Sequence, residues 1–450
     1  MRVDHSTTSG DSATETGSAG TVQERPATGA VPPDPTVPGG DGASTRLPAA
    51  FHRLWTAAVV SGLGDGLRYT ALPLLAASVS RAPGDVAAVT VAGMLPWLLF
   101  GLFVGVLADR VDRRTLMWTT DLVRGVVVAA FAVLLVVGEP SIPLIVAFAF
   151  AVGCAQVVFD TAAGAFLPAV VNPAQLGAAN GRLMAAQVLT SQFIGPPIAG
   201  LVFAFSVAWL FAVDAFTFVL AAVLVLTIRV PRREPGADGA GVGRDVIEGL
   251  RWLNRHRVLR DQSVIYGAMA LVSGALLGIF VLYVNDHLGL GSLGYGLLMA
   301  CFALGNVAVA PLVPRLRARW GDRAALTTAV LVVILTLTSL ALLPTPVVAG
   351  LSLFLFGAAA MTWMVVTVTV RQELVPDALL GRVTSTYRMI GFGANPLGAL
   401  AAGVTATLIG IRPMLAAGAA LVAVVAVAFR AGLGSQAAVD EHVGKDPAGA

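Results

Sequence analysis

Long apolar runs constrain the fold of this chain more than any other feature. They extend over about 20 residues or more and alternate with polar connections. An α-helix rises about 1.5 Å per residue, so each run is long enough to cross the roughly 30 Å hydrocarbon core of a bilayer. Charged residues make up 12% of the chain, whereas soluble domains carry about 25%. The sequence therefore predicts an all-α membrane protein. A β-barrel is disfavoured because its strands would need only about ten residues of alternating polarity.

The apolar runs predict twelve transmembrane helices in two pseudo-symmetric six-helix bundles. The first six are expected at 53–80, 86–108, 115–138, 143–168, 179–205 and 207–229. The second six are expected at 262–285, 294–314, 324–343, 346–372, 382–408 and 411–430. The N-terminal bundle then occupies 49–229 and the C-terminal bundle 261–430.

Polar segments flank and separate the two bundles. Residues 1–48 are rich in Ser, Thr, Gly, Pro and acids, a composition typical of disorder, so we expect a disordered cytoplasmic tail without a signal peptide. Residues 431–450 form a second cytoplasmic tail. The cytoplasmic linker, 230–260, contains apolar residues at helical spacing: Val246, Ile247, Leu250 and Leu253. They predict an amphipathic helix on the membrane surface, and a solvated linker helix is the alternative.

Arginine distribution predicts the orientation. Connections on the N-terminal side hold most of the inter-helix arginines, among them Arg110, Arg113, Arg114, Arg315, Arg317, Arg319, Arg323, Arg371 and Arg382. The other side offers little beyond Arg81 and Arg412. By the positive-inside rule both termini are cytoplasmic, in a multi-pass protein of the plasma membrane.

Several functional classes lack their motifs. The only lysine, Lys445, does not follow a phosphate-binding glycine loop, so we expect no ATP hydrolysis. No Gly-x-Ser-x-Gly or His-Glu-x-x-His motif is present, and the histidines and the two cysteines are scattered. We therefore expect no enzyme activity, cofactor, metal site or nucleic-acid partner, and an ion gradient as the energy source.

Ionisable residues inside apolar segments are costly and indicate function. Asp65 lies in the middle of the first predicted helix, in Ser61-Gly62-Leu63-Gly64-Asp65-Gly66-Leu67-Arg68. Burial favours the protonated carboxyl, whereas Arg68, three residues later on the same face, favours the carboxylate. This competition suits a proton-coupled switch. The alternative is a static ion pair that fixes the helix.

Other polar and aromatic residues are candidates for coupling or substrate contact. Asp160 and Arg388 are predicted in the cytoplasmic third, where they form an intracellular gate or extend to the headgroups. Asp214 is interpreted as structural, and Trp97 and Trp363 either stack on an organic substrate or pack in the core. Three glutamines contact substrate or bond between helices: Gln156, Gln187 and Gln192.

The connection after the second helix resembles a known signature. It reads Gly101-x-x-x-Gly105-Val106-Leu107-Ala108-Asp109-Arg110-Val111-Asp112-Arg113-Arg114, similar to the loop motif of the major facilitator superfamily. With Asp121-Leu122-Val123-Arg124 downstream and Ser61–Asp65 upstream, the chain resembles, over about residues 50–430, the branch of the enterobactin exporter and the macrolide efflux proteins. That branch comprises drug:proton antiporters.

The resemblance implies a cytoplasmic gate. Asp109 would accept hydrogen bonds from the start of the eleventh helix, near Gly381 and Arg382, only while the cytoplasmic side is closed. Topological retention of the arginines is the alternative. The motif residues assigned to this gate are Gly101, Gly105, Asp109, Arg110, Arg113, Arg114, Asp121 and Arg124.

Two further segments bear on the resemblance. The matching connection in the second half, 314–323, keeps basic residues but lacks the preceding acid, which implies an asymmetric gate. In the fifth helix, Gly195-Pro196-Pro197-Ile198-Ala199-Gly200 resembles the Gly-Pro motif of antiporters and permits bending.

Together these features predict a monomeric secondary transporter. It would export an amphipathic small molecule, such as an antibiotic, a siderophore or another secondary metabolite, by proton antiport and alternating access, and would confer multidrug resistance. The alternatives are a proton symporter that imports its substrate and a non-transporting membrane sensor with a transporter-like body.

Overall fold

A computed structural model describes residues 47–229 and 242–433, and these ranges contain helices and no strands. The N-terminal half comprises α1 (Ala49–Val79), α2 (Pro83–Arg110), α3 (Arg113–Val137), α4 (Ile142–Val170), α5 (Leu176–Gln187), η2 (Val188–Ile194), α6 (Gly195–Phe203) and α7 (Val207–Leu226). The short η1 (Pro173–Gln175) precedes α5, and α5, η2 and α6 together form one span.

The C-terminal half follows the linker helix α8 (Val242–Arg255). It comprises α9 (Arg257–Asp286), α10 (Ser292–Val309), α11 (Val313–Leu342), α12 (Pro346–Leu374), α13 (Asp377–Ile409), α14 (Ile411–Ala428) and the short η3 (Arg430–Leu433).

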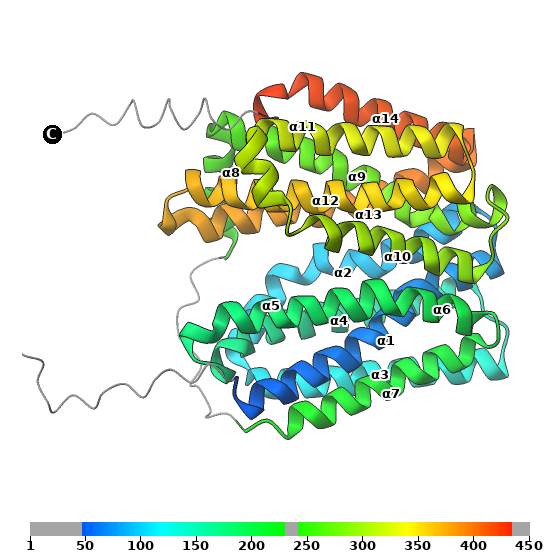
Figure 1. Cartoon of the computed structure of the whole chain (residues 1–450). Coiled ribbons are helices and arrows are strands. Elements are labelled where there is room, and N and C mark those ends of the chain that lie inside the picture. Colours follow the sequence, from blue (N-terminus) through cyan, green and yellow to red (C-terminus); the bar gives the residue numbers. More distant parts are fainter. Residues whose placement is uncertain (1–46, 230–241, 434–450) are drawn as a thin grey trace, which may run out of the picture. The chain divides into compact units, whose positions relative to one another are not determined.

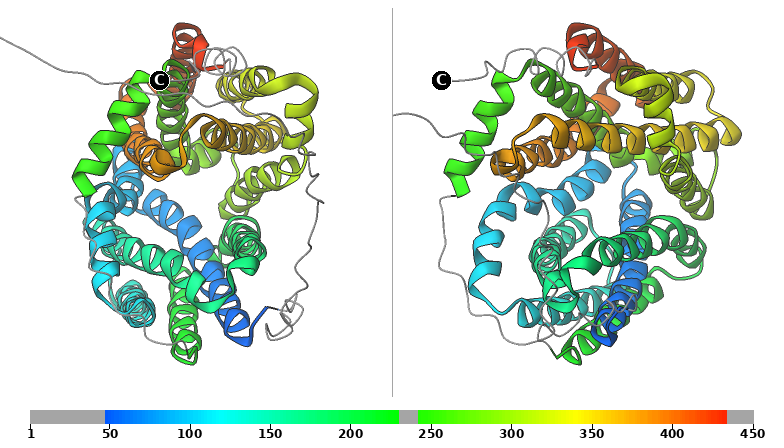
Figure 2. Two further views of the ribbon diagram at one scale, coloured as in Figure 1. Left: turned by 90° about the vertical axis from the view of Figure 1, so that its left-hand side faces the viewer. Right: turned by 60° about the vertical axis from the view of Figure 1, so that its left-hand side comes forward.

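Eleven spans in the described ranges are long and apolar enough to cross a membrane. The helix that completes the set of twelve is α1, the first in the chain. It is not among the eleven because glycines and two charged residues, Asp65 and Arg68, interrupt its apolar character. The predicted fold class, twelve transmembrane helices in two six-helix bundles, is confirmed. The two groups of helices are separate in Figures 1 and 2, and α1 begins at the same end of the bundle at which α14 ends.

The two halves meet along α2 with α13 and along α6 with α10. The described contacts between them include residues at the end opposite the chain ends and residues near the middle of the bundle. At that end Ser292 Oγ donates to Gly200 O at 2.7 Å, and Arg81 lies 3.6 Å from Asp286. Trp97 stacks on Phe392 farther along, with ring centroids 5.0 Å apart. Small residues at this seam allow the backbones to approach closely.

Two helices deviate from regular α geometry. η2 is a π-helical turn between α5 and α6, directly before the Gly-Pro motif that predicted a bend. In α11, Gly321 has φ 75°, so a short helix precedes the break and the long span follows it.

The linker helix packs on α13. A Cβ on Gly249 would lie 2.7 Å from Arg382 O, and Glu248 pairs with Arg382 at 2.8 Å. The helix in the linker was predicted, and its position on the membrane surface stays a prediction. The side chains of Val246 and Ile247, and the tails 1–46 and 434–450 predicted to be disordered or cytoplasmic, lie outside the described residues.

Candidate functional site: a buried charge network

A chain of charged side chains crosses the interior of the N-terminal half. In α1, Arg68 Nη2 lies 2.5 Å from Asp65 Oδ1, as the spacing in the sequence predicted. The same guanidinium reaches α7, where its Nε lies 3.3 Å from Asp214 Oδ2. Arg68 therefore joins two carboxyls on two different helices.

A second arginine extends the network to α3 and α4. Arg124 Nη2 lies 2.5 Å from Asp121 Oδ1, and its Nη1 donates to Gln156 Oε1 at 2.5 Å. The guanidinium lies between the rings of Phe159 and Phe218, with centroid distances of 4.5 and 4.1 Å. These ring faces favour a cation in the apolar interior.

Asp65 connects the two arginine centres. Its Oδ1 lies 3.9 Å from Arg124 Nη1 as well as 2.5 Å from Arg68. At the other end, Gln156 Nε2 donates to Asp160 Oδ1 at 3.0 Å. The side chains of Asp121, Asp214 and Arg124 are fully buried, whereas that of Asp65 is 13% exposed. The network thus holds four carboxyls and two guanidiniums, with Asp65 partly accessible at its centre.

Glycines in α1 permit this close assembly. A Cβ on Gly64 would collide with Asp214 Oδ1 and Thr217 Oγ1 of α7. A Cβ on Gly66 would lie 2.6 Å from Ser191 O of η2. The glycines that flank Asp65 in the sequence therefore let α7 and η2 approach the charged part of α1.

The remaining candidate residues for coupling or substrate contact lie outside the network. Gln187 and Gln192 are exposed on α5 and η2. Arg388 is exposed on α13 in the other half. Trp363 is buried in α12, where its Nε1 donates to Tyr387 OH at 3.0 Å. The structure therefore brings Asp65, Arg68, Gln156 and Asp160 together in one network. The other four candidates lie outside it.

The predicted gate residues divide into two groups. Asp121 and Arg124 belong to the buried network, whereas Arg113 Nη1 donates to Ala165 O of α4 at 2.8 Å. Gly101 lies in α2, and nothing beyond their place in that helix is described for Gly105, Asp109 and Arg110. Arg382, expected near Asp109 when the gate closes, pairs with Glu248 of α8.

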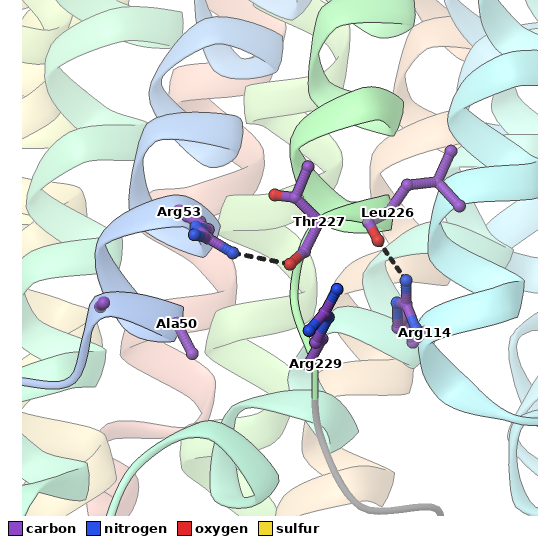
Figure 3. Close-up of a pocket in the computed structure, with 7 residues that line it drawn as sticks. Ala50, Arg53, Arg114, Leu226, Thr227 and Arg229 are labelled. Atoms are coloured by element: carbon purple, nitrogen blue, oxygen red, sulfur yellow. Dashed lines mark hydrogen bonds between the residues drawn. The ribbon is translucent and has the colours of Figure 1, made fainter.

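Arg114 lines a separate pocket of about 780 Å³ at the end of α7 (Figure 3). It donates to Val225 O at 3.3 Å and to Leu226 O, and Arg53 donates to Thr227 O at 2.7 Å. Cations at the C-terminal carbonyls of a helix interact favourably with its dipole. This pocket lies apart from the charge network.

The Gly-Pro motif packs at two interfaces. A Cβ on Gly195 would lie 2.8 Å from Gly66 Cα in α1. Gly200 and Pro196 instead contact α10, near Ser292 and Gly296. The motif therefore packs the span that contains η2 against α1 on one side and against α10 of the C-terminal half on the other.

Asp214, interpreted from the sequence as structural, has its carboxyl beside Arg68 and so joins the network, and whether its role is structural stays a prediction. Sequence reasoning also gave no functional role to Arg371, Tyr387 or Tyr266. One feature of the sequence could have indicated a functional role for Asp214: it is an acid in an otherwise apolar helix. No group of three or more His, Cys, Asp or Glu side chains in the described ranges is placed to hold a metal ion.

Comparisons with known proteins agree on one class. The sequence model of the family described as Transmembrane secretion effector matches residues 45–446. The chain is 29% identical over 380 residues to the multidrug efflux pump Tap of Mycolicibacterium fortuitum, covering 79% of this chain and 89% of that protein. It is 26% identical over 378 residues to macrolide efflux protein A of Streptococcus pyogenes, covering 80% and 90%.

The fold is also found among solved structures. A bacterial homologue of the iron transporter ferroportin, in an inward-facing state, superposes with a TM-score of 0.68. The match covers 85% of this chain and 98% of that chain at 15% sequence identity. At this identity the similarity establishes the fold alone.

Proposed function

Because the chain belongs to the transmembrane secretion effector family of the major facilitator superfamily, we propose that it exports an amphipathic small molecule in exchange for protons. The cargo class would be an antibiotic, a siderophore or another secondary metabolite. The observation that carries the proposal is the buried network, in which three carboxyls lie beside two guanidiniums and a fourth, Asp160, is joined to them through Gln156.

Charge balance supports proton binding by this network. Four ionised carboxyls and two guanidiniums would leave a net charge of −2 in a medium where an unpaired charge is costly. Protons on the carboxyls in excess would remove this charge. Asp65 is proposed as the residue that links protonation to movement, because its Oδ1 lies beside both arginines and its side chain, like that of Asp160, is only partly buried.

The same geometry provides a route from protonation to movement. A proton on Asp65 weakens its attraction to Arg68, which then interacts mainly with Asp214 of α7. The balance of forces between α1 and its neighbours α3 and α7 therefore changes with the proton. In alternating access, such a change would favour one of two arrangements of the bundles.

Asp65→Asn tests the proposal in everted membrane vesicles with an imposed pH gradient. Addition of erythromycin or ethidium to wild-type vesicles is expected to release protons, reported by an acridine dye. Asp65→Asn keeps the size of the side chain but cannot ionise, so we expect proton release below roughly one-tenth of the wild-type rate.

Glu139→Gln is the matched control because Glu139 is exposed in the connection between α3 and α4. It should couple like the wild type. Unchanged coupling in Asp65→Asn would refute the site assignment. Proton movement of the opposite sign would indicate symport, and no response to either compound would favour a membrane sensor.

A further inference from the structure

A buried arginine in the C-terminal half has unsatisfied donors. Arg371, in the last turn of α12, is only 4% exposed. Its Nε and Nη1 have no hydrogen-bond partner, and no carboxylate of the described residues lies within salt-bridge distance. Among buried charges this is unusual, because a guanidinium in an apolar interior normally has an acid or a carbonyl beside it.

One aromatic ring, that of Tyr387, lies against this guanidinium, and other side chains pack on that ring. Arg371 Cζ lies 3.8 Å from the centroid of the Tyr387 ring, and Tyr266 stacks on the other tyrosine at 4.5 Å with an interplanar angle of 10°. Trp363 Nε1 and Thr367 Oγ1 lie 3.0 and 3.5 Å from Tyr387 OH and hold that ring in place. The ring face stabilises the cation but accepts no N–H···O hydrogen bond.

A second cation lies close to the first. Arg388 follows Tyr387 in α13, is exposed, and acts electrostatically on both Arg371 and Tyr266. Two neighbouring cations repel each other. The position of Arg371 at the C-terminal end of α12 and its contact with Tyr387 offset part of this cost, but neither satisfies its two free donor atoms. A bound oxyanion would offset the repulsion between the two cations and would accept hydrogen bonds from both donor atoms.

We propose that Arg371, Arg388 and the stacked Tyr266 and Tyr387 form a binding site for the anionic group of an aromatic substrate. A carboxylate would accept hydrogen bonds from the free donors of Arg371, and the substrate ring would pack against Tyr266, which is partly exposed, whereas Tyr387 is buried. The inference rests on the proposed function, because it adds organic anions to the molecules that the exporter would carry beside the cations erythromycin and ethidium.

The contrast between the two halves supports this assignment. The N-terminal network has more carboxyls than guanidiniums and would repel an anion. The site in the C-terminal half has two guanidiniums and no paired carboxylate among the described residues. An anionic group is therefore drawn to the C-terminal half, and protons to the N-terminal half.

Equilibrium binding to the purified protein in detergent tests the site without a proton gradient. The probes are 2-naphthoate and 1-pyrenebutyrate, each compared with its uncharged primary amide. Wild-type protein should bind at least one acid about tenfold more tightly than its amide, as expected for charge-assisted hydrogen bonds. Arg371→Gln should abolish this preference, and Arg371→Lys should retain part of it.

Arg319→Gln removes an exposed arginine from the same half and should leave the preference unchanged. If Arg371→Gln does not fold, Arg388→Gln replaces it and should reduce the preference. Equal affinity of the wild type for acids and amides would overturn the proposal, as would an undiminished preference in Arg371→Gln. A wild type that prefers the acids but moves no protons would instead contradict only the proposed antiport.

Discussion

At the scale of single residues, Gly64 determines how closely the carboxyl of Asp214 approaches α1. A Cβ at this position would overlap Asp214 Oδ1 and Thr217 Oγ1. We expect Gly64→Ala to displace α7, to separate Asp214 from Arg68 and to lower drug efflux by about tenfold or more. Efflux of ethidium from loaded cells measures the effect.

Gly164→Ala is the control for Gly64→Ala, because it adds the same methyl group to α4 where no atom lies within 4 Å. It should transport like the wild type. Equal activity of both variants would mean that α7 can shift without loss and that the Arg68–Asp214 contact is dispensable.

The sequence could predict only the local part of the network. Asp65 and Arg68 are three residues apart on one helix, so their pairing follows from helical geometry. Asp121 and Arg124 have the same spacing, but the resemblance assigned them to the gate. The contact of Arg68 with Asp214 depends on how α1 and α7 pack, which no local pattern encodes.

At the scale of elements, the spans were predictable and their irregularities were not. Each apolar run identifies a helix because lipid requires all backbone hydrogen bonds to be made within the segment. The π-helical turn η2 and the break at Gly321 could not be predicted, because a span with such an irregularity is as apolar as a regular helix. The Gly-Pro motif indicated a bend in the fifth span but gave no π geometry.

The docking of α8 on α13 is a second feature at this scale, and it is testable. Gly249 packs against α13: a Cβ added at this position would lie 2.7 Å from Arg382 O and 2.5 Å from Thr386 Oγ1. Gly249→Val should therefore detach α8 and let it unfold locally, so that trypsin, which cleaves unfolded segments, cuts after the exposed Arg251 and Arg255 roughly fivefold faster or more. The rate is followed by electrophoresis of the purified protein.

Leu250→Ala provides the comparison for Gly249→Val, because Leu250 is 50% exposed. Its cleavage rate should match that of the wild type. Rapid cleavage of the wild type after Arg251 and Arg255 would contradict the docked position of α8. Equal rates at these two sites in all three proteins would mean that the Gly249 contact does not hold the helix.

At the scale of the whole molecule, the proposed alternating access requires the two halves to separate at the end where Arg81 and Asp286 lie. Arg81, between α1 and α2, and Asp286, at the end of α9, lie 3.6 Å apart and belong to different halves. Alternating access requires this distance to grow in each cycle. A link between the two positions should hold the transporter in one state.

Cysteines at these two positions test that requirement after the native Cys154 and Cys301 are replaced by Ser. Cross-linking Arg81→Cys to Asp286→Cys with a bis-methanethiosulfonate should reduce ethidium efflux to below about one-tenth, because the halves can no longer separate at that end. A reducing agent should restore it.

A link within one half separates immobilisation of the bundles from chemical damage. Ser80 and Asp85 lie at the same end, both in the N-terminal half, with their side chains 2.5 Å apart. Cross-linked Ser80→Cys/Asp85→Cys should transport normally because the two positions move together. If the pair that bridges the halves also transports when fully cross-linked, the substrate does not leave through an opening between α2 and α9, and the rocking of two rigid bundles is the wrong description of this molecule.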